Sequence, residues 1–285
     1  MTPHDLSELS ELPVIFDCAG ERLIGVLSLA NQPTDTGVLI LVGGRQYRVG
    51  SHRQLVLLSR RLASADFCCM RFDFCGMGDS TGEPQSFETV DADIAAALAA
   101  FKTHCPHLKR VVLWGLCDAA SAAVLYWQRT QDPFVAGLCL VNPWLRTDAS
   151  LARARVRYYY VERLLDPAFW RKLLTGGVGL RTSIGEYLGQ RRIARYAIQT
   201  GSADFVTQTL EGLRSFPSAL LVVLSGRDLV AKEFMYTLVC NGNASVFTST
   251  HRICKDIPNA DHTFSQTASR EELEATVLTW LEESF

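Results

Sequence analysis

Apolar residues in this chain fall into short runs that alternate with helical patterns. The run at residues 37–42 is unbroken, and the mostly apolar segments 67–73, 110–114, 135–141 and 219–224 read as further buried strands. Unbroken runs of this length are typical of strands that are buried on both faces. Helical patterns lie between them, at about 51–65, 88–102 and 117–128. Strands that alternate with helices predict right-handed crossovers and a mostly parallel sheet with helices on both faces.

The two ends of the chain have different patterns. Residues 13–18 and 23–29 read as two strands joined by a turn at Ala19-Gly20-Glu21, which predicts an antiparallel hairpin. Residues 246–254 are expected to form the last strand, and residues 269–282 a closing amphipathic helix.

The alternation stops between residues 144 and 215, where the sequence has helical stretches rich in Arg and aromatic residues but no buried strand. We expect this segment to be a helical cap inserted into a core formed by residues 1–143 and 216–285. It carries 12 basic and six acidic residues. Two interpretations stay open. The segment is either a solvated surface on which the aliphatic parts of the Arg side chains cover apolar surface, or a cap whose positive electrostatic field attracts an anionic substrate or partner.

Composition narrows the function classes. The chain has 285 residues, 48% of them hydrophobic, so it can bury a full core. Its net charge of −2 gives no reason to expect nucleic-acid binding. No window approaches 18 uninterrupted apolar residues, and the first residues do not resemble a secretory signal. The nine cysteines lack metal-ligand spacing. We therefore expect a cytoplasmic protein without a membrane span, a metal site or a cofactor.

One stretch points to chemistry. Residues 111–114 are followed by Gly115, Cys117 and Ala119, in the pattern small-x-nucleophile-x-small of a nucleophile elbow. The residues two positions either side of the nucleophile must be small because the strand-to-helix turn is tight. Ser121 lies in a similar frame, but one helical turn later, where we interpret it as close helix packing.

A thiol nucleophile needs a base, and the base needs an acid that orients it. His262 lies in a loop after the last expected strand, and Asp228 follows the strand at 219–224. The order Cys117, Asp228, His262 is nucleophile, acid, base, as in hydrolases with this elbow. Each residue has a structural alternative: a buried inert Cys, a helix N-cap and a loop surface His. Asp118 is a possible rival acid, but the residue after the nucleophile mainly offers its backbone N–H. Asp261 is adjacent to His262 and is expected to point away from it.

The oxyanion formed during acyl transfer needs preorganised donors. The backbone N–H of Asp118, at the start of the helix after the elbow, is one candidate. The loop after residues 37–42 should supply the other, with the N–H of Arg45 favoured and that of Gln46 as the alternative. His52 and Trp144 are candidates for substrate binding.

Several segments together resemble a known family. Asp73, Gly76, Gly78 and Ser80 match the D-x-x-G-x-G-x-S turn of α/β-hydrolases, and the elbow, the acid turn and residues 259–262 complete the pattern over nearly the whole chain. Residues 42–54 and 115–122 look more narrowly like type 1 of the exosortase-associated hydrolases of bacteria. That resemblance implies an α/β-hydrolase fold, a cytoplasmic location, and a link to exopolysaccharide production and protein sorting at the envelope. Two features depart from the common pattern: Gly43-Gly44 replaces His-Gly, and the nucleophile is Cys, as in dienelactone hydrolases.

These observations lead to one function hypothesis and two alternatives. The leading hypothesis is an ester or thioester hydrolase that acts on a small-molecule acyl substrate through an acyl-enzyme on Cys117. The alternatives are an acyltransferase that uses the same intermediate, and a binding protein that uses the fold without catalysis. The oligomeric state, the identity of the acyl group and cap motion are not indicated by the sequence.

Overall fold

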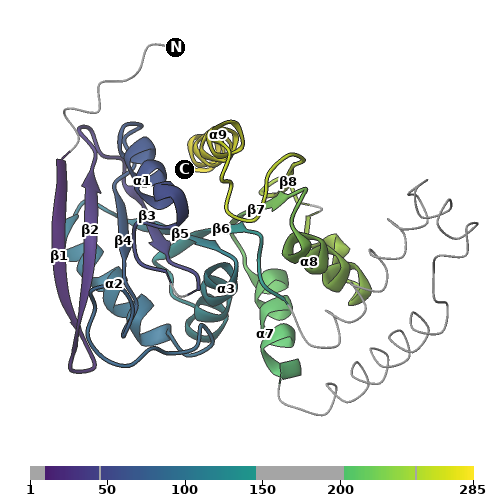
Figure 1. Ribbon diagram of the computed structural model, residues 1–285, viewed down its shortest axis with the longest axis horizontal. Coiled ribbons are helices and arrows are strands. Elements are labelled where there is room, and N and C mark those ends of the chain that lie inside the picture. The colour runs from purple at the N-terminus through teal and green to yellow at the C-terminus, as the bar shows by residue number, and fades with distance from the viewer. Residues whose placement is uncertain (1–9, 45, 146–201, 248) are drawn as a thin grey trace, which may run out of the picture.

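The described part of the chain forms one sheet with helices on both faces. The computed structural model describes residues 10–44, 46–145, 202–247 and 249–285 (Figure 1). Its strands are β1 (Ser10–Cys18), β2 (Glu21–Leu29), β3 (Thr36–Leu41), β4 (Cys69–Phe72), β5 (Arg110–Leu116), β6 (Val135–Val141), β7 (Ala219–Ser225) and β8 (Arg252–Ile257). Its helices are α1 (Gln54–Ala63), α2 (Asp91–His104), α3 (Asp118–Thr130), α7 (Ser202–Ser215), α8 (Leu229–Cys240) and α9 (Thr267–Ser284), with short 3-10 segments η2 (Ser51–Arg53) and η4 (Ala244–Phe247).

The strand order is β1-β2-β4-β3-β5-β6-β7-β8. β1 pairs antiparallel with β2, and β2 antiparallel with β4, so the predicted opening hairpin is confirmed. Every later pairing is parallel. The mostly parallel α/β sheet follows from the alternation of buried runs and helical patterns.

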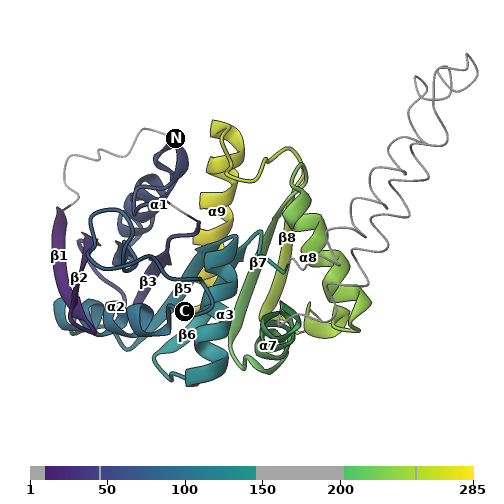
Figure 2. The ribbon, with the colours of Figure 1, turned by 60° about the horizontal axis from the view of Figure 1, so that its bottom comes forward.

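Two apolar layers enclose the sheet. One layer packs α1 and α9 on one face, and the other packs α2, α3, α7 and α8 on the opposite face. Figure 2 shows this separation, with α1 and α9 above the sheet and α2, α3 and α7 below it. Because both faces are covered, the central strands β3 and β7 are buried along their whole length.

The last strand differs from its predicted position. The sequence pattern favoured residues 246–254, whereas β8 covers Arg252–Ile257 and η4 takes up Val246. β8 lies at the edge of the sheet, and four of its six residues are exposed. An edge strand needs fewer apolar side chains than a central one, so the hydrophobic pattern misplaced it by several residues.

Most of the expected cap, residues 146–201, lies outside the described residues. The end of that segment is described as α7, which packs on α3. A Cβ added to Gly212 would lie 2.7 Å from the Val124 side chain and 3.0 Å from that of Gln128. Residues 202–215 therefore belong, by their packing, to the layer that covers the sheet.

The carboxyl ends of the parallel strands meet at one edge of the sheet. Gly43 follows β3, Cys117 follows β5, Asn142 follows β6, Asp228 follows β7 and His262 follows β8. In open α/β sheets this edge is where ligands bind, and it holds the residues that the sequence singled out.

Candidate active site

Cys117 occupies a strained turn between β5 and α3. Its φ of 62° and ψ of −122° lie in a region that costs a non-glycine residue about 1–3 kcal/mol. Backbone hydrogen bonds hold the turn: the Cys117 N–H donates to the Val141 carbonyl at 2.9 Å, and the Trp144 N–H donates to the Cys117 carbonyl at 3.1 Å. The side chain is thus placed beyond the end of the strand, partly exposed.

Gly115 makes the tight turn possible. A Cβ at this position would lie 2.6 Å from the backbone of Ala119 and 2.6 Å from the nitrogen of Ala120. These distances are well inside van der Waals contact, so a side chain would push α3 away from β5. The requirement for a small residue two positions before Cys117 therefore has a direct steric cause.

His262 is held by Asp228. Asp228 is 7% exposed, and its Oδ2 lies 2.7 Å from His262 Nδ1. Its Oδ1 accepts the Val230 N–H at 3.0 Å and so caps α8. The carboxylate therefore has two functions at once, since the helix-cap role and the His-orienting role use different oxygens.

The charge state of His262 follows from its neighbours. The hydrogen bond to Asp228, and next the neighbouring Cys117 side chain, raise the pKa of His262 to about 10, against 6.5 for an ordinary histidine. The imidazole is then cationic at neutral pH. With Nδ1 engaged by Asp228, Nε2 is the ring nitrogen left for the thiol side of the site.

The loop after β3 contacts the start of α3. The Gly44 N–H donates to Asp118 Oδ1 at 2.8 Å, and the Ala119 N–H donates to the same atom at 2.9 Å. Burial raises the pKa of the Asp118 carboxyl. A Cβ at Gly43 would lie 2.4 Å from the Leu116 carbonyl oxygen and 2.6 Å from Asp118 Oδ1. The absence of a side chain at Gly43 therefore lets the loop approach the elbow closely.

The oxyanion candidates differ in what the structure describes. Arg45 lies outside the described residues. Gln46 is described, and its Oε1 accepts from both the backbone N–H and the hydroxyl of Ser51, each at 3.0 Å. The Gly44 N–H is taken by Asp118, so Gly44 does not supply the donor expected from this loop.

Asn142 is a buried residue that the sequence reasoning did not select. It has a φ of 45°, a conformation that Asn tolerates better than most residues. Its Nδ2 donates to Ser225 Oγ at 2.8 Å and to the His262 carbonyl at 3.2 Å, and its Oδ1 accepts the Ser225 N–H at 2.8 Å. Asn142 thus ties the ends of β6 and β7 to the His262 loop. Its only sequence signal is a polar residue directly after a buried strand.

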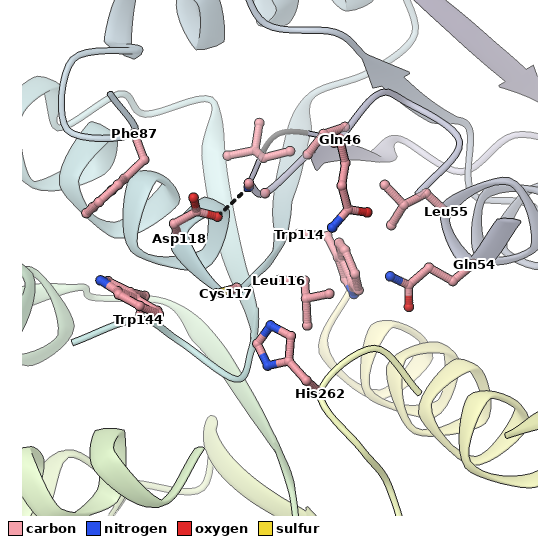
Figure 3. A pocket seen from close by; sticks show the side chains of 14 residues that line it. Gln46, Gln54, Leu55, Phe87, Trp114, Leu116, Cys117, Asp118, Trp144 and His262 are labelled. Carbon is pink, nitrogen blue, oxygen red and sulfur yellow. Dashed lines mark hydrogen bonds between the residues drawn. The ribbon is translucent and has the colours of Figure 1, made fainter. Parts of the chain in front are cut away.

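A pocket of about 370 Å³ opens beside the thiol (Figure 3). It is lined by Leu41, Val42, Gly43, Gly44, Gln46, Gln54, Leu55, Phe87, Trp114, Leu116, Cys117, Asp118, Trp144 and His262. The pocket thus brings together Cys117, Asp118, Gln46, His262 and the substrate-binding candidate Trp144. His52 is exposed and does not line it.

The remaining motif residues have structural contacts. Asp73 is fully buried and accepts the backbone N–H of Arg48 at 2.6 Å and that of Asp79 at 3.0 Å, while the Arg48 guanidinium pairs with its carboxylate. Ser121 Oγ donates to the Trp144 carbonyl at 2.5 Å, and Asp261 accepts from Ser265. These contacts fit a structural turn, helix packing and an acid directed away from His262.

The described residues contain neither a metal-ligand cluster nor a membrane-spanning helix. Among them, no group of three or more His, Cys, Asp or Glu side chains could hold a metal ion. Within the same ranges, no helix has both the length and the apolar character needed to cross a membrane.

Comparisons with known proteins agree with this architecture. The sequence model of the alpha/beta hydrolase family matches residues 39–276. No curated protein matches the chain significantly. Among solved structures, the Pyrococcus furiosus esterase Pf2001 is similar over 100% of this chain and 96% of its own, with a TM-score of 0.64 and 16% identity.

Two further structures show the same similarity. A thermophilic esterase from Thermogutta terrifontis, in a malate-bound structure, aligns with 96% of this chain and 99% of its own at 18% identity, with a TM-score of 0.57. The alpha/beta hydrolase GrgF from Penicillium sp. sh18 aligns with 97% of this chain and 99% of its own at 18% identity, with a TM-score of 0.63. At these identities the likeness concerns the fold.

Proposed function

Because the chain belongs to the alpha/beta hydrolase family, we propose that it cleaves an ester or thioester through a covalent acyl-enzyme on Cys117. The single observation that carries the proposal is the position of His262. Its Nδ1 lies 2.7 Å from Asp228 Oδ2, and the ring lies with Cys117 in the wall of one pocket. A nucleophile, a base and an orienting acid in this relation are what acyl transfer requires.

The first half of the reaction forms the acyl-enzyme. The Cys117 thiolate attacks the acyl carbon while cationic His262 lies beside it. The resulting oxyanion accepts hydrogen bonds from the Asp118 N–H, at the start of α3, and from the N–H of Arg45 or Gln46. The positive end of the α3 dipole favours the same charge. Collapse of the intermediate breaks the bond to the leaving alcohol or thiol, which takes its proton from His262 Nε2.

The second half releases the acid. His262, now neutral, takes a proton from a water molecule, which attacks the acyl carbon of the thioester on Cys117. The second tetrahedral intermediate collapses with expulsion of the Cys117 thiolate, and the carboxylic acid leaves. His262 then holds the proton again, next to Asp228. The thiol nucleophile favours activated acyl groups over amides. A thiolate leaves a tetrahedral intermediate more readily than an amine does, so attack on an amide tends to reverse.

Trapping the intermediate tests the proposal. Wild-type protein mixed with an activated aryl ester or a thioester should gain the mass of one acyl group, located on Cys117 by peptide mapping. The Cys117→Ala variant should gain no mass and lose turnover, while Cys117→Ser retains a weaker nucleophile in the same position. Full turnover by Cys117→Ala would exclude the mechanism. Labelling of folded protein by chloroacetamide at Cys117 separates a reactive thiol from a binding module.

We also propose the narrower affiliation with the exosortase-associated hydrolases and a cytoplasmic location. The support for the first is the sequence of residues 42–54 and 115–122. The support for the second is that all nine cysteines are free, as expected in a reducing compartment. Loss of the gene should then change the acyl groups of an envelope polysaccharide, which chemical analysis of that polysaccharide would detect.

A further inference from the structure

Two polar side chains in the pocket wall have no hydrogen-bond partner among the described residues. They are Gln54, whose Oε1 is unpaired, and Trp114, whose Nε1–H is unpaired. Gln54 is 4% exposed and Trp114 is 1% exposed. Buried polar atoms of folded proteins are nearly always paired, so two unpaired atoms on residues of one pocket wall are candidates for contact with a ligand.

The two residues come from different elements and lie in the same part of the pocket. Gln54 is the first residue of α1, and Trp114 is in β5, three residues before Cys117. In Figure 3 Gln54, Leu55 and Trp114 lie on one side of Cys117 and His262, and Phe87 and Trp144 lie on the other. Both residues therefore belong to the wall of the same pocket as Cys117 and His262.

The surroundings make these two atoms selective. Three apolar residues of the pocket wall, Val42, Leu55 and Leu116, pack in the same apolar layer as Trp114. In apolar surroundings water competes weakly for hydrogen bonds to the protein. A polar atom that stays unpaired therefore destabilises the enzyme–substrate complex. A substrate that lacks the matching group is therefore disfavoured more strongly than it would be at an exposed site.

The pair of atoms specifies a chemical group. Trp114 Nε1–H can only donate, and Gln54 Oε1 can only accept. A hydroxyl does both, because its oxygen accepts from the indole and its O–H donates to the amide oxygen. A carboxylate has no proton for Gln54, an ammonium has no lone pair for Trp114, and an alkyl chain pairs with neither.

We propose that Gln54 and Trp114 form a specificity subsite for a hydroxyl group of the substrate, so that the enzyme acts on hydroxylated esters or thioesters in preference to their deoxy analogues. The proposal rests on the hydrolase function proposed above. The hydroxyl has two possible sources, the acyl chain and the leaving group, and the same chemistry recognises either.

The test compares matched substrates in two arms. The acyl arm uses N-acetylcysteamine thioesters of hexanoic, 3-hydroxyhexanoic and 3-oxohexanoic acids. The leaving-group arm uses propyl hexanoate and 3-hydroxypropyl hexanoate. In one arm, kcat/KM for the hydroxylated substrate should exceed that of the deoxy substrate at least tenfold. A ratio near one in both arms, as expected if only a fixed water fills the subsite, would overturn the proposal. So would a preference for the oxo compound, which offers no donor to Gln54.

Variants assign the preference to the two residues. Gln54→Leu removes the acceptor and Trp114→Phe removes the donor, and each should bring the hydroxy-to-deoxy ratio close to one. Phe87→Leu reshapes the other side of the pocket without removing a polar atom, so it should change kcat/KM for both substrates alike and keep the ratio. An unchanged ratio in Gln54→Leu and Trp114→Phe would contradict the assignment.

Binding to Cys117→Ala separates this proposal from the proposed function. Calorimetry with the hexanoyl and 3-hydroxyhexanoyl thioesters, and with the two propyl esters, needs no turnover. Preferential binding of a hydroxylated compound without any acyl-enzyme in wild-type protein would support the subsite and refute the hydrolase mechanism. Acyl-enzyme formation with equal binding of all compounds would do the reverse.

Discussion

Asp228 contacts His262 with one carboxylate oxygen and caps helix α8 with the other. Oδ2 lies 2.7 Å from His262 Nδ1, and Oδ1 accepts the Val230 N–H at 3.0 Å. The cap fixes the carboxylate relative to the backbone after β7, and the fixed carboxylate in turn orients the imidazole. A structural interaction and a proposed catalytic one are therefore coupled through a single side chain.

This coupling can be separated by two substitutions. Asp228→Asn keeps an oxygen that can cap α8 but removes the charge beside His262, so it should keep the stabilisation from the cap, lose that from the charged pair, and lower kcat about 10²–10⁴-fold. Asp228→Ala loses the cap as well, and should cost about 1 kcal/mol more in unfolding free energy. Thermal unfolding and turnover of an activated thioester measure the two effects. Equal stability of both variants would show that Oδ1 contributes no cap.

The raised pKa of His262 predicts a pH-dependent stability. The folded protein holds this proton up to a pH of about 10, whereas an ordinary histidine releases it near 6.5. The stabilising contribution of His262 is then fully present below pH 6.5 and is lost as the pH rises from 6.5 towards 10. The difference in unfolding free energy between wild type and His262→Gln should accordingly be largest below pH 6.5 and shrink up to pH 10.

Urea unfolding at a series of pH values measures this difference. His251→Gln, at an exposed residue before β8, provides the matched His-to-Gln control, and a trend of equal size in this variant would show that the effect does not come from His262. Asp228→Asn removes the first cause of the shift, so it should flatten the trend in the same way as His262→Gln. A difference that stays constant from pH 6.5 to 10 would contradict the charge state assigned to His262.

The sequence identified residues that follow strands in local motifs. Cys117 was recognisable because its small neighbours, Gly115 and Ala119, are required by the steric closeness of β5 and α3. Asp228 and His262 were recognisable as polar residues after apolar strands, in an order shared with related hydrolases. Such features are local, and local patterns can be read from the chain.

Other features depend on contacts that cross the fold. Asn142 bonds to Ser225 and His262, which are 83 and 120 residues away. Trp114 lies in a wholly apolar run, where nothing indicates that its Nε1–H has no partner. Which side chains of a buried strand reach a pocket is decided by the packing of the neighbouring elements, and an unbroken apolar run carries no such information.

Asn142 should act as a positioning residue, since it contacts the His262 backbone and does not line the pocket. Asn142→Gly removes its hydrogen bonds without backbone strain at φ 45°. We expect unfolding free energy to fall by about 1–3 kcal/mol, because the Ser225 N–H loses its partner. We also expect kcat to fall while KM changes little, because the imidazole is displaced and the pocket is not.

Asn142→Ala provides the comparison, as it loses the same bonds and adds strain of about 1 kcal/mol. Gln131→Gly is the distant control, at an exposed residue with a φ of 51° after α3, and should leave kcat unchanged. If Asn142→Gly raised KM and left kcat intact, the residue would be acting on the pocket and not on His262.

The loop at Gly43 and Gly44 allows the proposed oxyanion site to be tested by adding single methyl groups. Ala at position 43 places a Cβ 2.4 Å from the Leu116 carbonyl oxygen and 2.6 Å from Asp118 Oδ1, so the loop must move away from the elbow. Ala at position 44 meets no atom within 4 Å and keeps the N–H bond to Asp118, and only its φ of 65° is unfavourable, by about 1–2 kcal/mol. The two variants therefore have the same amino-acid composition, and only Gly43→Ala displaces the loop.

Gly43→Ala should therefore lower kcat/KM at least tenfold, since removing one oxyanion donor costs roughly 10²–10³-fold in rate, whereas Gly44→Ala should stay within about threefold of wild type. Steady-state kinetics with one activated thioester and thermal unfolding of both variants measure this. If the loss in Gly43→Ala lies in kcat, with KM nearly unchanged, the loop acts on the transition state. Equal kinetics for the two variants would show that the loop position does not matter for the reaction, and the second oxyanion donor would then have to be sought outside residues 43–46.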